Sequence, residues 1–250
     1  MDTHSLLTSA VLQAAQHVDN LPVDLAVKLA TLKARVDQEP SREPEDELAA
    51  ELERLFGPLA DQYADQIVLG RQPETQDSDN RLLVLLLLAL LGATAASITQ
   101  RAAALGITLS VTDINQVATR WAQQYTFDAV RGINNTTRQA ISDAISTYTS
   151  TPGMDKADVV KLLEPVFGKR RAEMIATTEI TRAYSQAAHI TQMEMQQRGI
   201  ETREQWVTWR DDRVCPICAP LHNSFDWHSS VVYGPPAHVN CRCWLALVRV

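Results

Sequence analysis

The sequence has only four cysteines among 250 residues, and none of them comes before position 215. No histidine is followed two positions later by glutamate. A zinc deaminase needs that H-x-E pattern upstream of its cysteine pair, with the glutamate as proton shuttle, so this class of enzyme is excluded. No two histidines are adjacent either, which argues against a nuclease of the zinc-stapled HNH type.

The sequence also lacks the basic start of a secretory signal peptide, since it begins Met1-Asp2-Thr3-His4. Clustered cysteines in such a chain are expected to bind a metal in a reducing compartment. Apolar residues make up 45% and charged residues 21%, as in an ordinary soluble globular protein. Residues 1–80 hold 6 Lys/Arg against 16 Asp/Glu, whereas residues 81–250 hold 17 against 14. The acidic first third would repel DNA and suits a basic protein partner or solubility.

The four cysteines lie in two short segments near the C-terminus. The first is a C-x-x-C turn, Cys215 to Cys218, and the second offers His238, Cys241 and Cys243. Zn²⁺ takes four such ligands in a tetrahedron, and a C-x-x-C turn directs two thiolates at one point. Because five candidates compete for four places, the sequence predicts a closed structural site that holds one zinc ion per chain.

Three other interpretations of the cysteines remain open at this point. They are a disulfide pair, a redox-active C-x-x-C and buried free thiols. A thioredoxin-like motif would lie between a strand and a helix of a βαβ unit, and no such unit precedes Cys215. The choice between His238 and the fourth cysteine is also open, because either set fits a tetrahedron.

Apolar residues recur at three- and four-residue spacing up to about residue 200, which predicts α-helices. We expect them over residues 6–18, 23–36, 45–69, 80–105, 112–148, 155–167 and 170–197. After Gly199 the pattern changes, and residues 204–209 and 243–248 have the alternation of two short strands. The sequence therefore predicts a mainly α fold, a multi-helix body with a small C-terminal zinc-stapled β unit.

One leucine-rich segment is long enough to resemble a membrane span. Residues 82–100 are 19 uncharged positions between Arg81 and Arg101, close to the ~20 residues that cross a bilayer. Its second half is rich in Gly, Thr, Ala, Ser and Gln, so only the run from Leu82 to Leu91 is strongly apolar. We therefore expect no membrane contact and a helix that is buried in the core or against another subunit.

Five sequence blocks resemble the phage Mu F-like minor head protein family. They are residues 125–138 (YTFDAVRGINNTTR), 170–184 (RRAEMIATTEITRAY), 206–209 (WVTW), 211–218 (DDRVCPIC) and 235–243 (PPAHVNCRC). The resemblance covers roughly residues 155 to 245, and the first hundred residues are not recognised. The chain departs from the family at Asn223, often Gly, and at Val239, often Pro. Asparagine tolerates a left-handed backbone, so the first change is mild.

The resemblance implies a non-enzymatic minor component of a tailed-phage head. Its expected partners are the portal protein, the major capsid protein or both, with double-stranded DNA as a further candidate. Several copies are expected in each virion, after assembly in the host cytoplasm, and the role is in head assembly and genome packaging or delivery. The sequence divides into an acidic helical region (1–75), a helical region with the leucine-rich helix (76–153) and the Mu F-like domain (154–250), whose zinc unit covers 204–250. A DNA-binding or metal-dependent nuclease-like head protein is the alternative.

Charged residues in and beside the recognised blocks allow two interpretations each. Glu179 and Arg182 lie three apart, so they predict an ion pair within one helix, or a clamp between that helix and the zinc unit through Arg213 or Arg242. The run Lys169, Arg170 and Arg171 fits a solvated helix end, with a DNA contact as the alternative.

Polar and aromatic residues around the cysteines also require a role. Asp211 is predicted to form a turn, and its pairing with Asp212 on Mg²⁺ in a nuclease is the less favoured interpretation. His222 and His228 are expected to face solvent. The tryptophans are expected to form an apolar wall and not a base-stacking platform, because few Lys/Arg flank them; they are Trp206, Trp209, Trp227 and Trp244.

Overall fold

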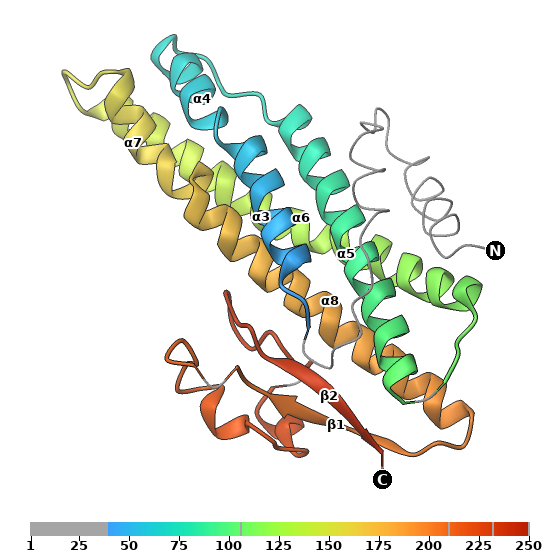
Figure 1. Cartoon of the computed structure of the whole chain (residues 1–250). Helices are drawn as coiled ribbons and strands as arrows, with labels where there is room; N and C mark the ends of the chain where they lie inside the picture. Colours follow the sequence, from blue (N-terminus) through green and yellow to red (C-terminus); the bar gives the residue numbers. More distant parts are fainter. Residues whose placement is uncertain (1–39, 106, 210, 232, 250) are drawn as a thin grey trace.

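The computed structural model describes residues 40–249 except 106, 210 and 232. In this part of the chain an elongated bundle of helices lies beside a small sheet (Figure 1). The elements are α3 (Glu43–Phe56), α4 (Leu59–Val68), α5 (Gln76–Ala104), α6 (Val111–Ser150), α7 (Lys156–Phe167), α8 (Lys169–Gln197), β1 (Thr202–Val207) and β2 (Trp244–Arg249), with 3-10 turns at Ala219–Leu221 and Trp227–Ser229. The predicted mainly α fold is confirmed.

The predicted single helix over residues 45–69 is wrong. The chain forms two helices there, α3 and α4, which are separated at Gly57 and Pro58. Proline lacks a backbone N–H, and its ring clashes with the carbonyl of the preceding turn, so a proline disfavours the continuation of a helix. The helices predicted over 6–18 and 23–36 lie outside the described residues.

Helix α5 is the centre of the core. From Val84 to Ala95 every one of its residues is buried, whichever side of the helix it is on. It packs against α3, α6 and α8. By length and composition α5 could cross a membrane, but 83% of its most apolar window is buried inside the structure. The predicted core helix is confirmed, and neighbouring helices of the same chain cover it.

Helix α8 joins the bundle to the sheet. It packs against α3 and α5 in the bundle and also against β1 and β2 (Figure 1). The two strands pair antiparallel with Trp206 opposite Leu245, as the predicted strands required. The other edge of β1 is paired with a loop. The N–H of Trp206 donates to the carbonyl of Ser224, and the carbonyl of Trp206 accepts from the N–H of Asn223.

Helices from all three predicted sequence regions pack together. Thr177 of α8 donates a hydrogen bond to Glu45 of α3 at 2.6 Å, and Tyr184 donates to the carbonyl of Ser41 at 2.7 Å. Helix α4 in turn packs against α7. The predicted boundaries at 75 and 153 therefore remain predictions about the sequence, while the folded helices form one bundle.

Candidate metal centre

The first ligand-bearing segment is a tight turn. The backbone N–H of Cys218 lies 3.1 Å from the carbonyl of Cys215 and 3.3 Å from its sulfur, and the N–H of Ala219 bonds the same carbonyl. These bonds fold the C-x-x-C segment back on itself, so that both thiols point to one side. Backbone N–H groups aimed at a sulfur also stabilise its thiolate, the form that binds metal.

The second segment presents a histidine to that turn. The N–H of Cys241 bonds the carbonyl of His238, and Asn240 between them adopts a left-handed conformation, with φ 64°. The Nδ1 of His238 lies 2.8 Å from the carbonyl oxygen of Val239, so Nδ1 carries the proton. The lone pair of Nε2 is then the one that can bind a metal. Asn223, after the first turn, also has a left-handed backbone, with φ 65°.

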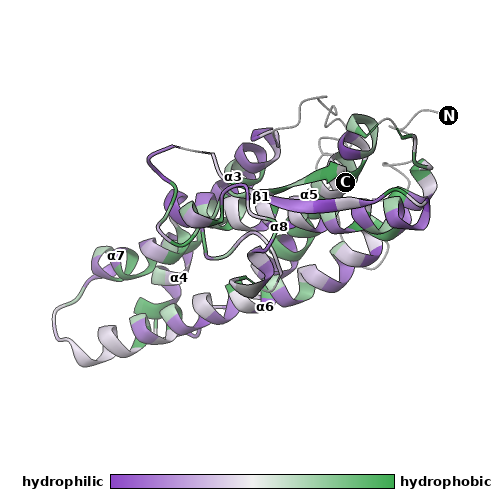
Figure 2. Cartoon of the chain, turned by 90° about the horizontal axis from the view of Figure 1, so that it is seen from below, coloured by the Kyte–Doolittle hydropathy of each residue, from purple (hydrophilic) through white to green (hydrophobic). Residues whose placement is uncertain are grey.

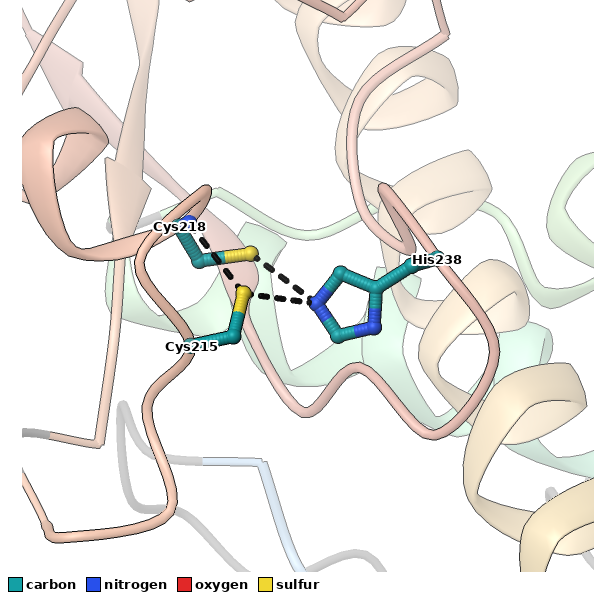
Figure 3. Close-up of side chains that lie close together, drawn as sticks. All are labelled: Cys215, Cys218 and His238. Carbon is teal, nitrogen blue, oxygen red and sulfur yellow. Dashed lines mark hydrogen bonds between the residues drawn. The ribbon is translucent and has the colours of Figure 1, made fainter.

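The five candidate ligands meet at one place. Nε2 of His238 lies 3.0 Å from the sulfur of Cys215 and 3.4 Å from that of Cys218 (Figure 3). The sulfurs of Cys218 and Cys241 are 3.8 Å apart, a separation close to that of two thiolates on one zinc ion at ~2.3 Å each. Two triads result, each able to hold a metal ion, and Cys218 belongs to both: Cys215–Cys218–His238 and Cys218–Cys241–Cys243.

The ionisable groups of the cluster favour a positive charge at its centre. Contacts with the thiols of Cys218 and Cys243 lower the pKa of the Cys241 thiol well below its usual value, which favours its thiolate form. Donation to Cys241 raises the pKa of Cys218 far above its usual value. Burial acts to lower the pKa of His238, but the Val239 carbonyl and the thiolates outweigh it and raise the pKa. A cation bound among these groups would take the place of the shared protons.

The cluster lines a small cavity. The four cysteines and His238 line a cavity of about 20 Å³, together with Trp209, Arg213 and Arg242 among others. All four cysteines are free thiols, with Cys218, Cys241 and Cys243 buried. The donor set of thiols and one imidazole fits zinc, which prefers such ligands in a tetrahedron.

Tryptophans form part of the wall of the unit, as predicted. Trp206 and Trp227 are fully buried and pack with Cys218, Cys241 and Cys243. Trp209 is half-buried and donates its ring N–H to the carbonyl of Arg242. Trp244 is buried and contacts the ring of Trp209. Apolar walls around thiols limit the access of water to the site.

Two threonines of α8 attach the second ligand segment to the bundle. The hydroxyl of Thr181 donates to the carbonyl of Cys241 at 2.8 Å, and the hydroxyl of Thr178 accepts from the N–H of Asn240 at 2.8 Å. These contacts could not be predicted from the sequence, because a threonine in a helix has no distinctive spacing. They fix the position of the metal-binding segment relative to α8.

Glu179 and Arg182 do not act as the predicted clamp. Glu179 accepts a hydrogen bond from the hydroxyl of Tyr125 in α6 at 2.8 Å, and Arg182 lies over the ring of the same tyrosine. Neither forms an ion pair with the other among the described residues. The contacts of α8 with the second ligand segment are made instead by Thr178 and Thr181. The pair therefore joins α6 to α8.

Arg242 instead bridges the two ligand-bearing segments. Its side chain, only 9% exposed, bonds both carboxylate oxygens of Asp211 at 2.7 and 2.8 Å. This contact lowers the pKa of Asp211. Asp211 also accepts from the N–H of Arg213, so it is the predicted turn-former. Its carboxylate is occupied by Arg242, which argues against a magnesium pair with Asp212.

Of the three predicted basic residues, two face solvent and the third contacts the helical bundle. Lys169 and Arg170 are exposed at the start of α8. Arg171 is half-buried and donates to the carbonyl of Ile133 in α6 at 3.1 Å, and burial lowers its pKa. The structure therefore brings only two of them to the surface. The DNA contact predicted for the three together remains untested.

The two histidines near the cluster differ in their exposure to solvent. His228 is exposed and stacks on Trp227, in agreement with the prediction. His222 is half-buried, and its Nδ1 accepts from the N–H of Thr208, so the prediction that it faces solvent is wrong. A further pair was not predicted at all: Nδ1 of His189 in α8 lies 2.5 Å from the carboxylate of Glu204 in β1.

Comparison with known proteins identifies the part of the chain that carries this site. Residues 131–246 match the family described as phage Mu protein F like protein. This segment belongs to the phage Mu F-like family. The Mu F-like segment begins inside α6, earlier than the predicted start near residue 155, and it ends inside β2, so it contains α7, α8, β1 and all five candidate ligands. No curated protein and no solved structure matches the chain.

The match of this segment to the phage Mu F-like family implies a role in phage head morphogenesis and association with the virion. It also suggests a structural and non-enzymatic role. The resemblance predicted from the five sequence blocks is therefore confirmed.

Proposed function

We propose that the protein is a structural minor component of a tailed-phage head. It is bound either to the portal protein at the portal vertex or to the interior of the capsid. There it acts in head assembly and in genome packaging or delivery. The observation that supports this proposal is the match of residues 131–246 to the phage Mu F-like family. The cysteines and His238 of that segment line a cavity of about 20 Å³, which has room for one ion, whereas pockets for small-molecule ligands are typically ~300–1,000 Å³.

We propose further that the ion is zinc, one per chain, and that its role is structural. Cys218 is a ligand because it belongs to both triads, and three of the other four candidates complete the tetrahedron. A two-stranded sheet is too small to be stable alone, so the metal supplies folding free energy to the unit. The zinc unit is then held rigidly on α8, where it forms a defined surface for a head protein.

The alternative of a nuclease is less favoured. Both oxygens of Asp211 bind Arg242, so they are not directed at a catalytic metal. The imidazole Nε2 of His238 faces two thiols and is not presented to a substrate.

Co-expression with head proteins of the same phage tests the proposal. The full-length chain is produced with the portal protein, and separately with the major capsid protein, and each mixture is purified by a tag on the chain and then by size exclusion. We expect a stable complex with one of them. Copurification of neither protein would contradict the proposed role.

Two variants make this experiment specific. Cys218→Ser should lose the complex, because the zinc unit loses its shared ligand. A double substitution, Lys169→Ala with Arg170→Ala, removes two exposed side chains at the start of α8 and should leave the complex intact.

A further inference from the structure

Helix α6 carries a row of exposed arginine, amide and aromatic side chains on one side. The residues follow one another at three- and four-residue intervals, so they share one face of the helix. We name this set the arginine stripe: Arg120, Gln124, Phe127, Arg131, Asn135 and Arg138, all exposed. At ~1.5 Å per residue the stripe spans about 27 Å from the first arginine to the last.

Two carboxylates neutralise part of the positive charge of the stripe. Arg120 makes no ion pair among the described residues. Arg131 lies 3.6 Å from Asp128, and both side chains are 72% exposed, a type of pair that contributes little. Arg138 bonds Asp79 at 2.8 Å, which directs its guanidinium and takes up part of its charge. The stripe itself contains no carboxylate.

The helix beneath the stripe is held in a fixed position. Ile114, Ala118, Ala122 and Val130 are buried on other sides of α6, which packs against α5. Arg171 of α8 bonds the carbonyl of Ile133, which also anchors the middle of the helix. In Figure 2, α6 runs along the outside of the bundle for most of its length. A ligand would therefore meet arginines whose backbone is already ordered.

We propose that the arginine stripe binds the phosphate backbone of double-stranded DNA without sequence specificity. Guanidinium groups bind phosphate oxygens in a bidentate manner, and the amides of Gln124 and Asn135 can donate beside them. The spacings of about 10 and 16 Å between successive arginines bracket the ~12 Å width of the major groove, so the helix can bridge phosphates on its two edges.

The composition of the stripe favours duplex over single-stranded DNA. Proteins that bind single strands stack successive bases on several aromatic side chains, whereas the stripe offers only Phe127. Several arginines on one face of a helix match the phosphates that line the edges of a duplex groove. The net charge of −7 does not oppose this contact, because residues 1–80 carry −10 and residues 81–250 carry +3.

Fluorescence anisotropy with a labelled random-sequence DNA duplex tests the proposal on the full chain. If two to three phosphates are contacted, raising KCl from ~50 to ~200 mM should weaken binding by about 12- to 40-fold. Substitution of Arg120, Arg131 and Arg138 by Ala should remove most of this salt dependence and weaken binding at low salt by about 10-fold or more. The corresponding Arg→Lys triple variant keeps the charge and should retain most of the binding.

A matched control changes the same charge elsewhere. Arg54, Arg71 and Arg81 are exposed outside α6, so their triple Ala variant should bind DNA within about twofold of wild type. Equal binding by the two triple Ala variants, or no wild-type binding at low salt, would overturn the proposal. A third outcome would also overturn it: the Ala variant of the stripe binds DNA as well as wild type but no longer copurifies with the portal protein or no longer self-associates. The stripe would then be a protein interface. The DNA result is independent of the proposed portal contact.

Discussion

The hydroxyl of Thr181 in α8 donates a hydrogen bond to the backbone carbonyl of Cys241, 60 residues further along the chain. Both groups are buried, so the bond connects the helical bundle directly to a candidate metal ligand. Together with the bond between Thr178 and Asn240, it sets the distance between α8 and the second ligand segment. The metal centre and the bundle are therefore expected to be thermodynamically coupled.

Replacing Thr181 with Val should destabilise the protein by about 1 to 3 kcal/mol, because the carbonyl of Cys241 would be buried without a partner. Denaturant unfolding measures this change, and a zinc-chelator competition should show weaker metal binding in the same variant. Thr99→Val serves as control, since the exposed Thr99 bonds only the carbonyl of Ala95 in its own helix. Equal losses in the two variants would contradict the coupling.

Glu179→Gln should alter the pH dependence of stability. Burial raises the pKa of Glu179 above its usual value of 4.5, so the folded chain holds this proton more tightly than the unfolded chain. Its contribution to stability is therefore full below pH ~4.5 and is lost as the pH rises through the folded-state pKa. Glutamine cannot ionise and can still accept from Tyr125.

Urea unfolding of both proteins between pH 4 and pH 7 measures the effect. The stability of Glu179→Gln relative to wild type should increase as the pH rises. Glu173→Gln, an exposed position of the same helix, should give a flat difference. A flat difference for Glu179→Gln as well would show that its carboxylate is not penalised by burial.

Gly132→Ala should stabilise the protein by about 1 kcal/mol, the difference in helix propensity between the two residues. Gly132 lies inside α6, and an added Cβ would meet nothing within 4 Å. Gly168→Ala is the contrasting variant, because its Cβ would come within 2.9 Å of the carbonyl oxygen of Glu164. Thermal unfolding should move the two melting temperatures in opposite directions.

Leu90→Ala should cost about 2 to 5 kcal/mol, because it opens a cavity in the centre of the core. Leu90 is fully buried on α5, whereas Leu69 after α4 is 67% exposed. Leu69→Ala should therefore change the free energy of unfolding by no more than about 0.5 kcal/mol. Similar losses at the two positions would contradict the central place of α5.

Features of the fold that depend on local pattern could be predicted from the sequence. The helix predicted over residues 155–167 begins as α7 at Lys156, and Asp155 before it accepts from the N–H of Asp158 in a capping box. The two strands follow from alternating residues, and the ligand segments follow from cysteine spacing. The break at Gly57 and Pro58 was also present in the sequence, but the apolar spacing on either side of it suggested one continuous helix.

Features that depend on contacts between distant segments could not be predicted. The partner of Glu179 is Tyr125, 54 residues away, so short-range helical spacing wrongly suggested Arg182. The pairs formed by Thr181 with Cys241 and by His189 with Glu204 likewise depend on how the sheet packs on α8. Such contacts become visible only when the three-dimensional arrangement of the helices is known.

The most direct test of the account is elemental mass spectrometry of the purified chain beside Cys218→Ser. We predict one zinc per wild-type chain, and loss of both the metal and thermal stability in the variant, because Cys218 belongs to both ligand triads. Absence of metal from the wild type, with a thiol titration that finds fewer than four free cysteines, would contradict the structural zinc site.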